Sequence, residues 1–262
     1  MGSQTPLELP TIDFSNIKNL TQGTTVWDST KARVLNAFQD HGCFEAYFDE
    51  ISDDLRNSVF ASLKQLFDLP LETKLQNIPD KFFNGYIGQN KDVPLYESLG
   101  IEDTRSFTHL TWPHGNPEFC NSIQSYIEKL TQLDQTVRMM ILGSLNLDKY
   151  LDEHMELTSY VLRVMSYRAP EKYESNLGLK AHADKNMMTI LHQNEVGGLE
   201  VQNGDEEWIK AKVSTNCFVV WRGKLSIFGQ MPFDYGEFVK FYSKKENFPH
   251  ESALKKFCGV SS

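Results

Sequence analysis

Residues 160–165 read YVLRVM, and they mark the point at which the hydrophobic pattern changes from a helical period to a period of two. Before this point, apolar residues recur at steps of three and four. After it, short alternating runs are separated by turn residues, which is typical of short strands in a sandwich or barrel. We therefore expect a mixed α/β (α+β) chain with a helical first half and a β-rich second half. The expected strands are residues 160–165, 188–192, 199–201, 208–211 and 217–220.

The sequence pattern of the first half predicts two short strands and three helices. The strands are expected at residues 9–15 and 43–48, and residues 75–117 look loop-rich because Gly, Pro, Asn and Asp recur there. Ser52 is suited to cap the second helix, and the apolar stripe of the third favours a surface facing the core over a cofactor groove. The expected helices are residues 29–39, 52–67 and 117–145.

The composition restricts the class of partner. The formal net charge is −9, and Lys and Arg are scattered, so a nucleic acid or an anionic membrane is not expected as a partner. The four cysteines form no C-x-x-C pair and no signal peptide is recognisable, which favours reduced thiols and a cytoplasmic location. We expect a monomer that acts on a small molecule and does not span a membrane.

The stretch with the clearest chemistry is residues 177–184, which read LGLKAHAD. In extended chain, His182 and Asp184 point to the same side, so both can bind one metal ion. His-x-Asp alone arises by chance in many chains. Two such ligands with a His from a distant strand make the facial triad of non-haem Fe(II) oxygenases.

The surroundings of this pair carry a resemblance to a known family. Residues 177–220 resemble the iron-binding segment of plant soluble 2-oxoglutarate dioxygenases, which shows Gly-x-x-x-His-Thr-Asp, then a Gly-Leu-x-Val turn and a Trp-rich strand. Ala183 stands where the family has Thr. Residues 9–15, 41–48 and 66–74 and the pair Gly85-Tyr86 match as well, in the family's order. The branch it resembles most includes enzymes that oxidise glucosinolate side chains and gibberellin-oxidase-like proteins.

The resemblance implies a double-stranded β-helix, or jelly roll, with an N-terminal helical region packed on it. It divides the chain into residues 1–150, a strand-plus-helices region, and residues 151–262, a jelly-roll region with a C-terminal helix. It also implies a plant-metabolite oxidoreductase that uses Fe(II), 2-oxoglutarate as cosubstrate and ascorbate as reductant. His182 and Asp184 would bind the iron, and Tyr167 stands where the family often places a tyrosine facing the cosubstrate.

The family pattern breaks after Val220. The family's second iron His and its Arg-x-Ser, which binds the distal carboxylate of 2-oxoglutarate, are missing. An internal deletion near residues 220–232 explains this gap and would leave the jelly roll incomplete and the chain inactive as written. His250 is a candidate replacement ligand, although its setting favours a loop or cap residue. Arg222 is a candidate for the cosubstrate, although coincidence is favoured.

Other interpretations of these residues remain open. His192 lies ten residues after His182, where a structural histidine is favoured over a ligand. The chain could be a non-catalytic dioxygenase-like protein that binds a small molecule or a protein partner. A zinc hydrolase built on His182 and Asp184 has less support, because no HExxH or Cys-rich ligand set accompanies them.

Overall fold

The computed structural model describes residues 7–78, 84–184, 186–203, 206–212 and 214–223, and these form two compact units. Within the described residues, the first unit comprises segments of 7–65, 116–160 and 182–223, and the second comprises segments of 66–115 and 161–181. Both units combine helices and strands, so the expected mixed α/β class is confirmed. The expected division of the chain near residue 150 stays a prediction, and both units draw on segments from either side of it.

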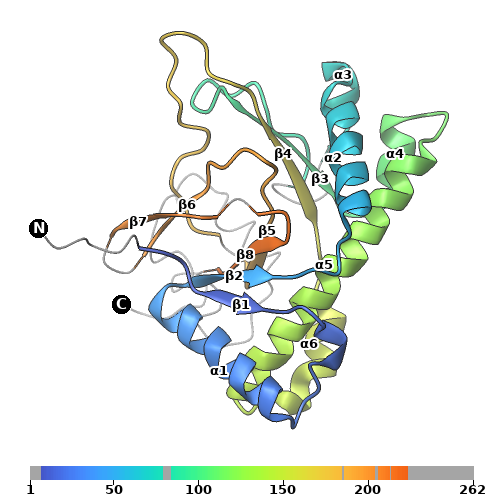
Figure 1. Ribbon diagram of the computed structural model, residues 1–262. Helices are drawn as coiled ribbons and strands as arrows, with labels where there is room; N and C mark the ends of the chain where they lie inside the picture. The colour runs from blue at the N-terminus through green and yellow to red at the C-terminus, as the bar shows by residue number, and fades with distance from the viewer. Residues whose placement is uncertain (1–6, 79–83, 185, 204–205, 213, 224–262) are drawn as a thin grey trace, which may run out of the picture. The chain divides into compact units, whose positions relative to one another are not determined.

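A four-stranded sheet forms the centre of the first unit (Figure 1). Its order is β1-β2-β8-β5; β1 and β2 are parallel, and β8 is antiparallel to both of its neighbours. A hairpin of two further strands, β6 and β7, is antiparallel. The bounds are β1 Thr11–Asp13, β2 Cys43–Tyr47, β5 Met188–Leu191, β6 Glu200–Gln202, β7 Trp208–Lys210 and β8 Cys217–Arg222.

Three helices of this unit, α1, α2 and α5, begin at a side chain that caps them. The Ser52 hydroxyl accepts a hydrogen bond from the backbone of Leu55, as predicted, and Asn116 caps the long helix in the same way. The first helix begins a turn earlier than predicted because Thr24 caps it. In Figure 1, α1 runs along β1 and β2 and contacts α5. The bounds are η1 Ile17–Asn19, α1 Thr25–Asp40, α2 Asp53–Phe67, α5 Pro117–Ser144, η2 Asp148–Tyr150 and α6 Leu151–Leu157.

The second unit contains a two-stranded antiparallel sheet of β3 (Tyr96–Ile101) and β4 (Leu162–Tyr167), with the helices α3 (Leu71–Lys74) and α4 (Thr104–Thr111). The expectation of a loop-rich stretch over 75–117 is therefore wrong for β3 and α4. The strand β3 exists because all six of its residues pair with β4, a partner more than sixty positions away in the sequence. Such pairing is invisible to a local pattern.

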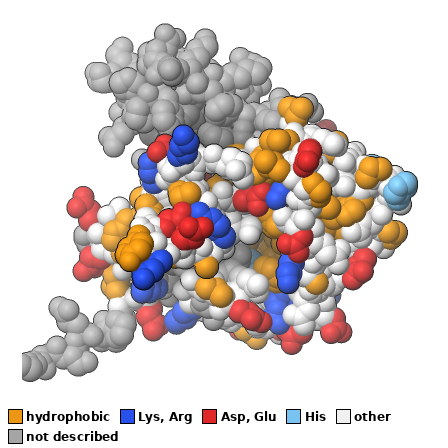
Figure 2. All heavy atoms as spheres, turned by 90° about the horizontal axis from the view of Figure 1, so that it is seen from above, with side chains coloured by type: hydrophobic (Ala, Val, Ile, Leu, Met, Phe, Trp, Pro, Cys, Tyr) orange, Lys and Arg blue, Asp and Glu red, His pale blue; other side chains and the backbone are white. Residues whose placement is uncertain are grey.

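The strands predicted for residues 188–220 are confirmed, and β4 begins two residues later than the pattern indicated. Core residues of the central sheet include Phe44, Phe218 and Val220, which are fully buried. On the face shown in Figure 2, acidic and basic side chains alternate with hydrophobic ones. Among the described helices, none is long and apolar enough to cross a membrane.

Phe218 is fully buried among aromatic rings, so truncating it should destabilise the protein strongly. Its ring lies 4.3 Å from the ring of His192 and 6.0 Å from that of Phe48, measured between centroids. We expect Phe218→Ala to lower the free energy of unfolding by about 3–5 kcal/mol, measured by urea denaturation. Leu157→Ala is the matched control, because that side chain is 77% exposed; its effect should stay within about 0.5 kcal/mol. Equal effects of the two substitutions would contradict this placement of Phe218.

Candidate functional site

His182 and Asp184 lie side by side in the segment that leads into β5. The imidazole Nε2 of His182 is 3.6 Å from Oδ1 of Asp184. The segment is not part of a strand, yet its backbone places both side chains on one side. The side chain of His182 is 56% exposed and that of Asp184 only 23%, so the carboxylate is the more enclosed of the two. An imidazole and a carboxylate this close together can bind the same metal ion.

The Asp184 carboxylate is held from one side by two hydrogen bonds. Its Oδ2 accepts from the hydroxyl of Thr189 in β5 and from the indole Nε1 of Trp221 in β8, which is 2.8 Å away. The hydroxyl of Thr189 in turn accepts from the side-chain amide of Asn186 at 2.7 Å. Outer-shell hydrogen bonds of this kind orient metal ligands and tune their affinity.

A buried polar network on α5 supports the segment that follows Asp184. Arg138 pairs with Asp134 at 2.6 Å, and both side chains are less than a tenth exposed. The Tyr160 hydroxyl donates to the same Asp134 oxygen at 2.7 Å. Arg138 also donates to Nε2 of His154 at 3.1 Å and to the sulfur of Met187 at 3.2 Å. The network thus connects α5 and α6 to Met187, which lies three residues after Asp184.

His154 is held in its neutral form within this network. Burial, and then the positive charge of Arg138, lowers its pKa below the usual value. Its Nε2 therefore accepts a hydrogen bond from the guanidinium. A neutral acceptor here avoids placing two positive charges together in a buried position.

His192 packs among aromatic rings and does not approach the pair. Its ring lies 4.3 Å from that of Phe218 and 5.6 Å from that of Phe60, and its Nδ1 hydrogen-bonds the Tyr126 hydroxyl at 2.9 Å. Burial, helped by the charge of Arg56, lowers its pKa to about 4. These contacts are those of a structural histidine, as the sequence favoured.

Tyr167 lies in the second unit, at the end of β4. Its ring is 5.3 Å from the ring of Tyr96, and about half of its surface is exposed. Gly178 packs directly against this ring, because a Cβ built at that position would come within 2.8 Å of it. Gly178 is the glycine of the motif that precedes His182, and this contact gives a physical reason for a glycine there.

Within the described part of the chain, no other predicted ligand is grouped with His182 and Asp184. Arg222 ends β8, where its backbone amide donates to the carbonyl of Gly42 at 3.1 Å. Side chains alternate along a strand, so Arg222 and Trp221 leave β8 on opposite faces. His250 lies outside the described residues. Among those that are described, no group of three or more His, Cys, Asp or Glu side chains could hold a metal ion.

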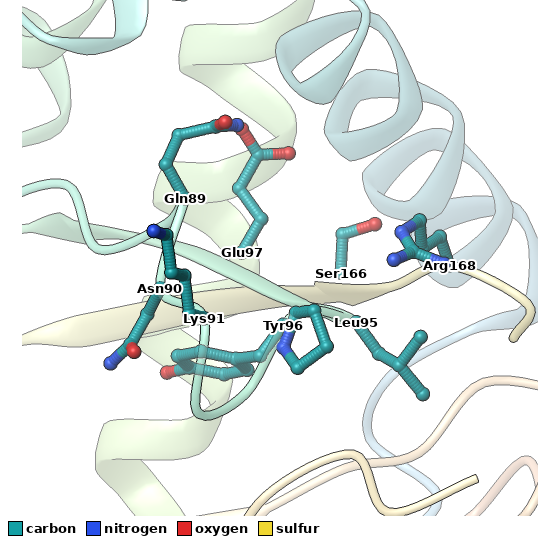
Figure 3. Close-up of a pocket in the computed structure, with 9 residues that line it drawn as sticks. Gln89, Asn90, Lys91, Leu95, Tyr96, Glu97, Ser166 and Arg168 are labelled. Atoms are coloured by element: carbon teal, nitrogen blue, oxygen red, sulfur yellow. The ribbon is translucent and has the colours of Figure 1, made fainter. Parts of the chain in front are cut away.

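A cavity of about 380 Å³ opens in the second unit, beside the β3–β4 sheet (Figure 3). Figure 3 shows Lys91, Glu97 and Arg168 among its lining residues. Arg168 is occupied by a bidentate pair with Glu174, at 2.6 and 2.7 Å. Among the residues that the structure describes, none of those predicted as metal or cosubstrate ligands lines this cavity.

Sequence reasoning missed Thr189, Trp221 and the Arg138 network. Thr189 and Trp221 are 32 positions apart, and only the pairing of β5 with β8 brings them to the same carboxylate. Asp134 and Arg138 could have been found from the sequence, because charges four residues apart interrupt the apolar stripe of the long helix.

Breaking the buried ion pair between Asp134 and Arg138 should lower the free energy of unfolding. Arg138→Met leaves the Asp134 carboxylate without its charged partner, so we expect a loss of about 3–5 kcal/mol in the free energy of unfolding by urea denaturation. Lys31→Met, which removes the partly exposed Lys31–Asp28 pair, should cost less than about 1 kcal/mol. Replacing both partners, Asp134→Leu with Arg138→Met, should cost less than Arg138→Met alone, and a larger loss would contradict this account.

His192 should make the protein sensitive to acid. Its pKa in the folded protein, about 4, lies below the usual 6.5. The unfolded chain therefore binds the proton first as pH falls, and stability is lost progressively from pH 6.5 towards 4. Between pH 7 and pH 4.5, the loss of unfolding free energy measured by urea denaturation should be smaller in His192→Gln than in the parent by about 2–3 kcal/mol. Part of the loss should remain, because burial also lowers the pKa of His154. The exposed His109→Gln should keep the parental loss, and a parental loss in His192→Gln would refute the assignment.

Comparisons with known proteins show the family to which the chain belongs. A model described as the 2OG-Fe(II) oxygenase superfamily matches residues 157–236, and one described as the N-terminal part of the non-haem dioxygenase in morphine synthesis matches residues 9–122. The chain is 45% identical over 228 residues to AOP1.2 of Arabidopsis thaliana, named a probable 2-oxoglutarate-dependent dioxygenase. That match covers 82% of this chain and 70% of the relative.

Two further comparisons extend the similarity. The 2-oxoglutarate-dependent dioxygenase AOP2 of the same plant is 28% identical over 347 residues, covering 85% of this chain and 79% of the relative. The solved structure of a dioxygenase for auxin oxidation from Arabidopsis thaliana, with 2-oxoglutarate bound, superposes with a TM-score of 0.72 at 21% identity. It covers 83% of this chain and 80% of that one. The chain therefore belongs to the family of Fe(II)- and 2-oxoglutarate-dependent dioxygenases.

Proposed function

We propose that this chain keeps two of the family's iron ligands, His182 and Asp184, and that its turnover as a dioxygenase of a small plant metabolite is severely reduced. The observation that carries the proposal is the approach of these two side chains to 3.6 Å, with no third potential ligand grouped with them among the described residues. Family members use Fe(II) and 2-oxoglutarate.

Each residue has a role that follows from its chemistry. O₂ would be the oxidant; bound Fe(II) would activate it, and 2-oxoglutarate would supply two electrons as it is oxidised to succinate and carbon dioxide, so that one oxygen atom enters succinate and the other the substrate. His182 contributes a neutral ring nitrogen, and Asp184 contributes a negative charge to a divalent cation. Two protein ligands hold a metal ion less firmly than three, so we expect weak but measurable binding.

The sequence after β8 supports the loss of the remaining ligands. Downstream of Val220 the whole chain contains one histidine, His250, and one arginine, Arg222. Arg222 leaves β8 on the face opposite Trp221, so it could serve the cosubstrate only if its side chain turned around the end of the strand. The alignment with AOP2 is longer than this chain itself, so that relative carries residues that this chain lacks.

The other features of the proposal follow from the family. The β-rich part would form an incomplete jelly roll, Tyr167 would face the cosubstrate, and ascorbate would keep the iron reduced. The protein would act as a cytoplasmic monomer. Similarity of fold to the auxin-oxidising dioxygenase supports the jelly roll. A non-catalytic protein that binds a small molecule or a protein is the second candidate, favoured by the incomplete ligand set.

Succinate release tests the proposal. With Fe(II), ascorbate, 2-oxoglutarate and candidate substrates, we expect at least about a hundredfold less succinate than an intact relative releases. Each lost charge-assisted bond to the distal carboxylate is worth about 1.5–3 kcal/mol, and a loss of 1.4 kcal/mol is tenfold in affinity. Inserting the family's missing segment after Val220 should restore turnover. Turnover in the chain as written that disappears in His250→Ala or Arg222→Ala would overturn the proposal.

Calorimetric titration with Fe(II) under anaerobic conditions separates the two candidates. If His182 and Asp184 form a weak iron site, His182→Ala and Asp184→Ala should each lower Fe(II) affinity at least about tenfold. The exposed His109→Ala should leave it unchanged. A parent chain with no measurable affinity, or one that His182→Ala does not alter, would instead favour the non-catalytic protein.

A further inference from the structure

We propose that Thr189 and Trp221 act as positioning residues, a clamp that fixes the Asp184 carboxylate in its metal-binding orientation before any metal arrives. The inference rests on the proposed function, because it takes Asp184 as a ligand. It goes further by assigning a role to two residues that lie outside the His-x-Asp motif. Neither residue would touch the metal.

The register of the sheet places both donors on one side of one carboxylate. Thr189 of β5 and Trp221 of β8 are direct partners across an antiparallel pair. Side chains that face each other in this way share a face of the sheet. Both reach the same atom, Oδ2 of Asp184, and the Trp221 bond is 2.8 Å long. The clamp therefore depends on β5 and β8 being paired in this register.

The direction of each hydrogen bond is determined by chemistry. An indole Nε1–H can only donate. The Thr189 hydroxyl has a single proton, and because it already accepts from Asn186 at 2.7 Å, that proton is free to point at Asp184. Oδ2 therefore accepts two hydrogen bonds from neighbouring side chains. The other oxygen, Oδ1, is the one nearest to His182 Nε2, at 3.6 Å, and is the atom presented to a metal.

The backbone beneath the clamp leaves little room for movement. The Gly223 amide, one residue beyond β8, donates to the carbonyl of Met187 at 2.9 Å. A Cβ at Gly223 would lie 1.9 Å from the carbonyl oxygen of Asn186, so only glycine permits this approach. Trp221 packs against a buried cluster that includes Cys43 and Val219. Asp184 is thus connected to the core of the first unit through its partner Trp221.

Metal affinity in the absence of 2-oxoglutarate tests the clamp. Thr189→Val keeps the side-chain shape and Trp221→Phe keeps an aromatic ring, while both remove the donor. We expect each to lower the affinity for Mn(II) and for anaerobic Fe(II) about tenfold in calorimetric titrations. Thr189→Ser, which keeps the hydroxyl, should remain within about threefold of the parent. Trp208→Phe is the matched control, because it makes the same chemical change at a half-exposed residue of β7.

Tryptophan fluorescence distinguishes a residue close to the bound metal from one that only stabilises the fold. Bound Mn(II) or Fe(II) should quench part of the tryptophan emission, and this part should be missing in Trp221→Phe and kept in Trp208→Phe. Circular dichroism would establish that each variant is folded before titration. Parental affinity in folded Thr189→Val and Trp221→Phe, combined with loss of affinity in His182→Ala, would overturn the clamp and leave the proposed function standing. No binding by the parent, or parental binding by His182→Ala, would overturn both.

Discussion

The hydrogen bonds from Thr189 and Trp221 to Asp184 are the interaction on which the candidate site depends. They join the His-x-Asp segment, which has no regular secondary structure of its own, to two paired strands. The strand β8 lies between β2 and β5, so its backbone is hydrogen-bonded on both sides. A segment without regular secondary structure is therefore held by a strand that is paired on both sides.

A second support reaches the same segment from the helical side. The Asp134–Arg138 pair is buried, and a buried charge is tolerated only when it is paired and hydrogen-bonded. Tyr160, His154 and Met187 complete the bonds that the pair needs. Since the guanidinium has a fixed planar geometry, it ties Met187 to a defined place on α5. The segment that follows His182 is thus held by polar contacts from two strands and from α5 within the first unit.

The nearby histidine shows why proximity in sequence does not make a ligand. His192 lies only ten residues after His182, yet its ring packs among the rings of Phe60, Phe218 and Tyr126. Its lowered pKa reflects this burial. The family resemblance implies a third ligand on a later strand, and the stretch after Val220 contains one histidine in all. If a segment has been lost there, as proposed, His192 does not replace the ligand that it would have carried.

The sequence by itself determined the mixed class, most helices and strands, and the pairing of His182 with Asp184. Those features follow from local rules: hydrophobic period, capping side chains such as Ser52, and the i, i+2 spacing. The family could also be recognised from the order of its motifs. Only the tertiary structure decided that β3 forms within a loop-rich stretch and that Thr189 and Trp221 meet at Asp184. The physical reason is that strand register is set by partners distant in the chain, and which donors reach a carboxylate depends on that register.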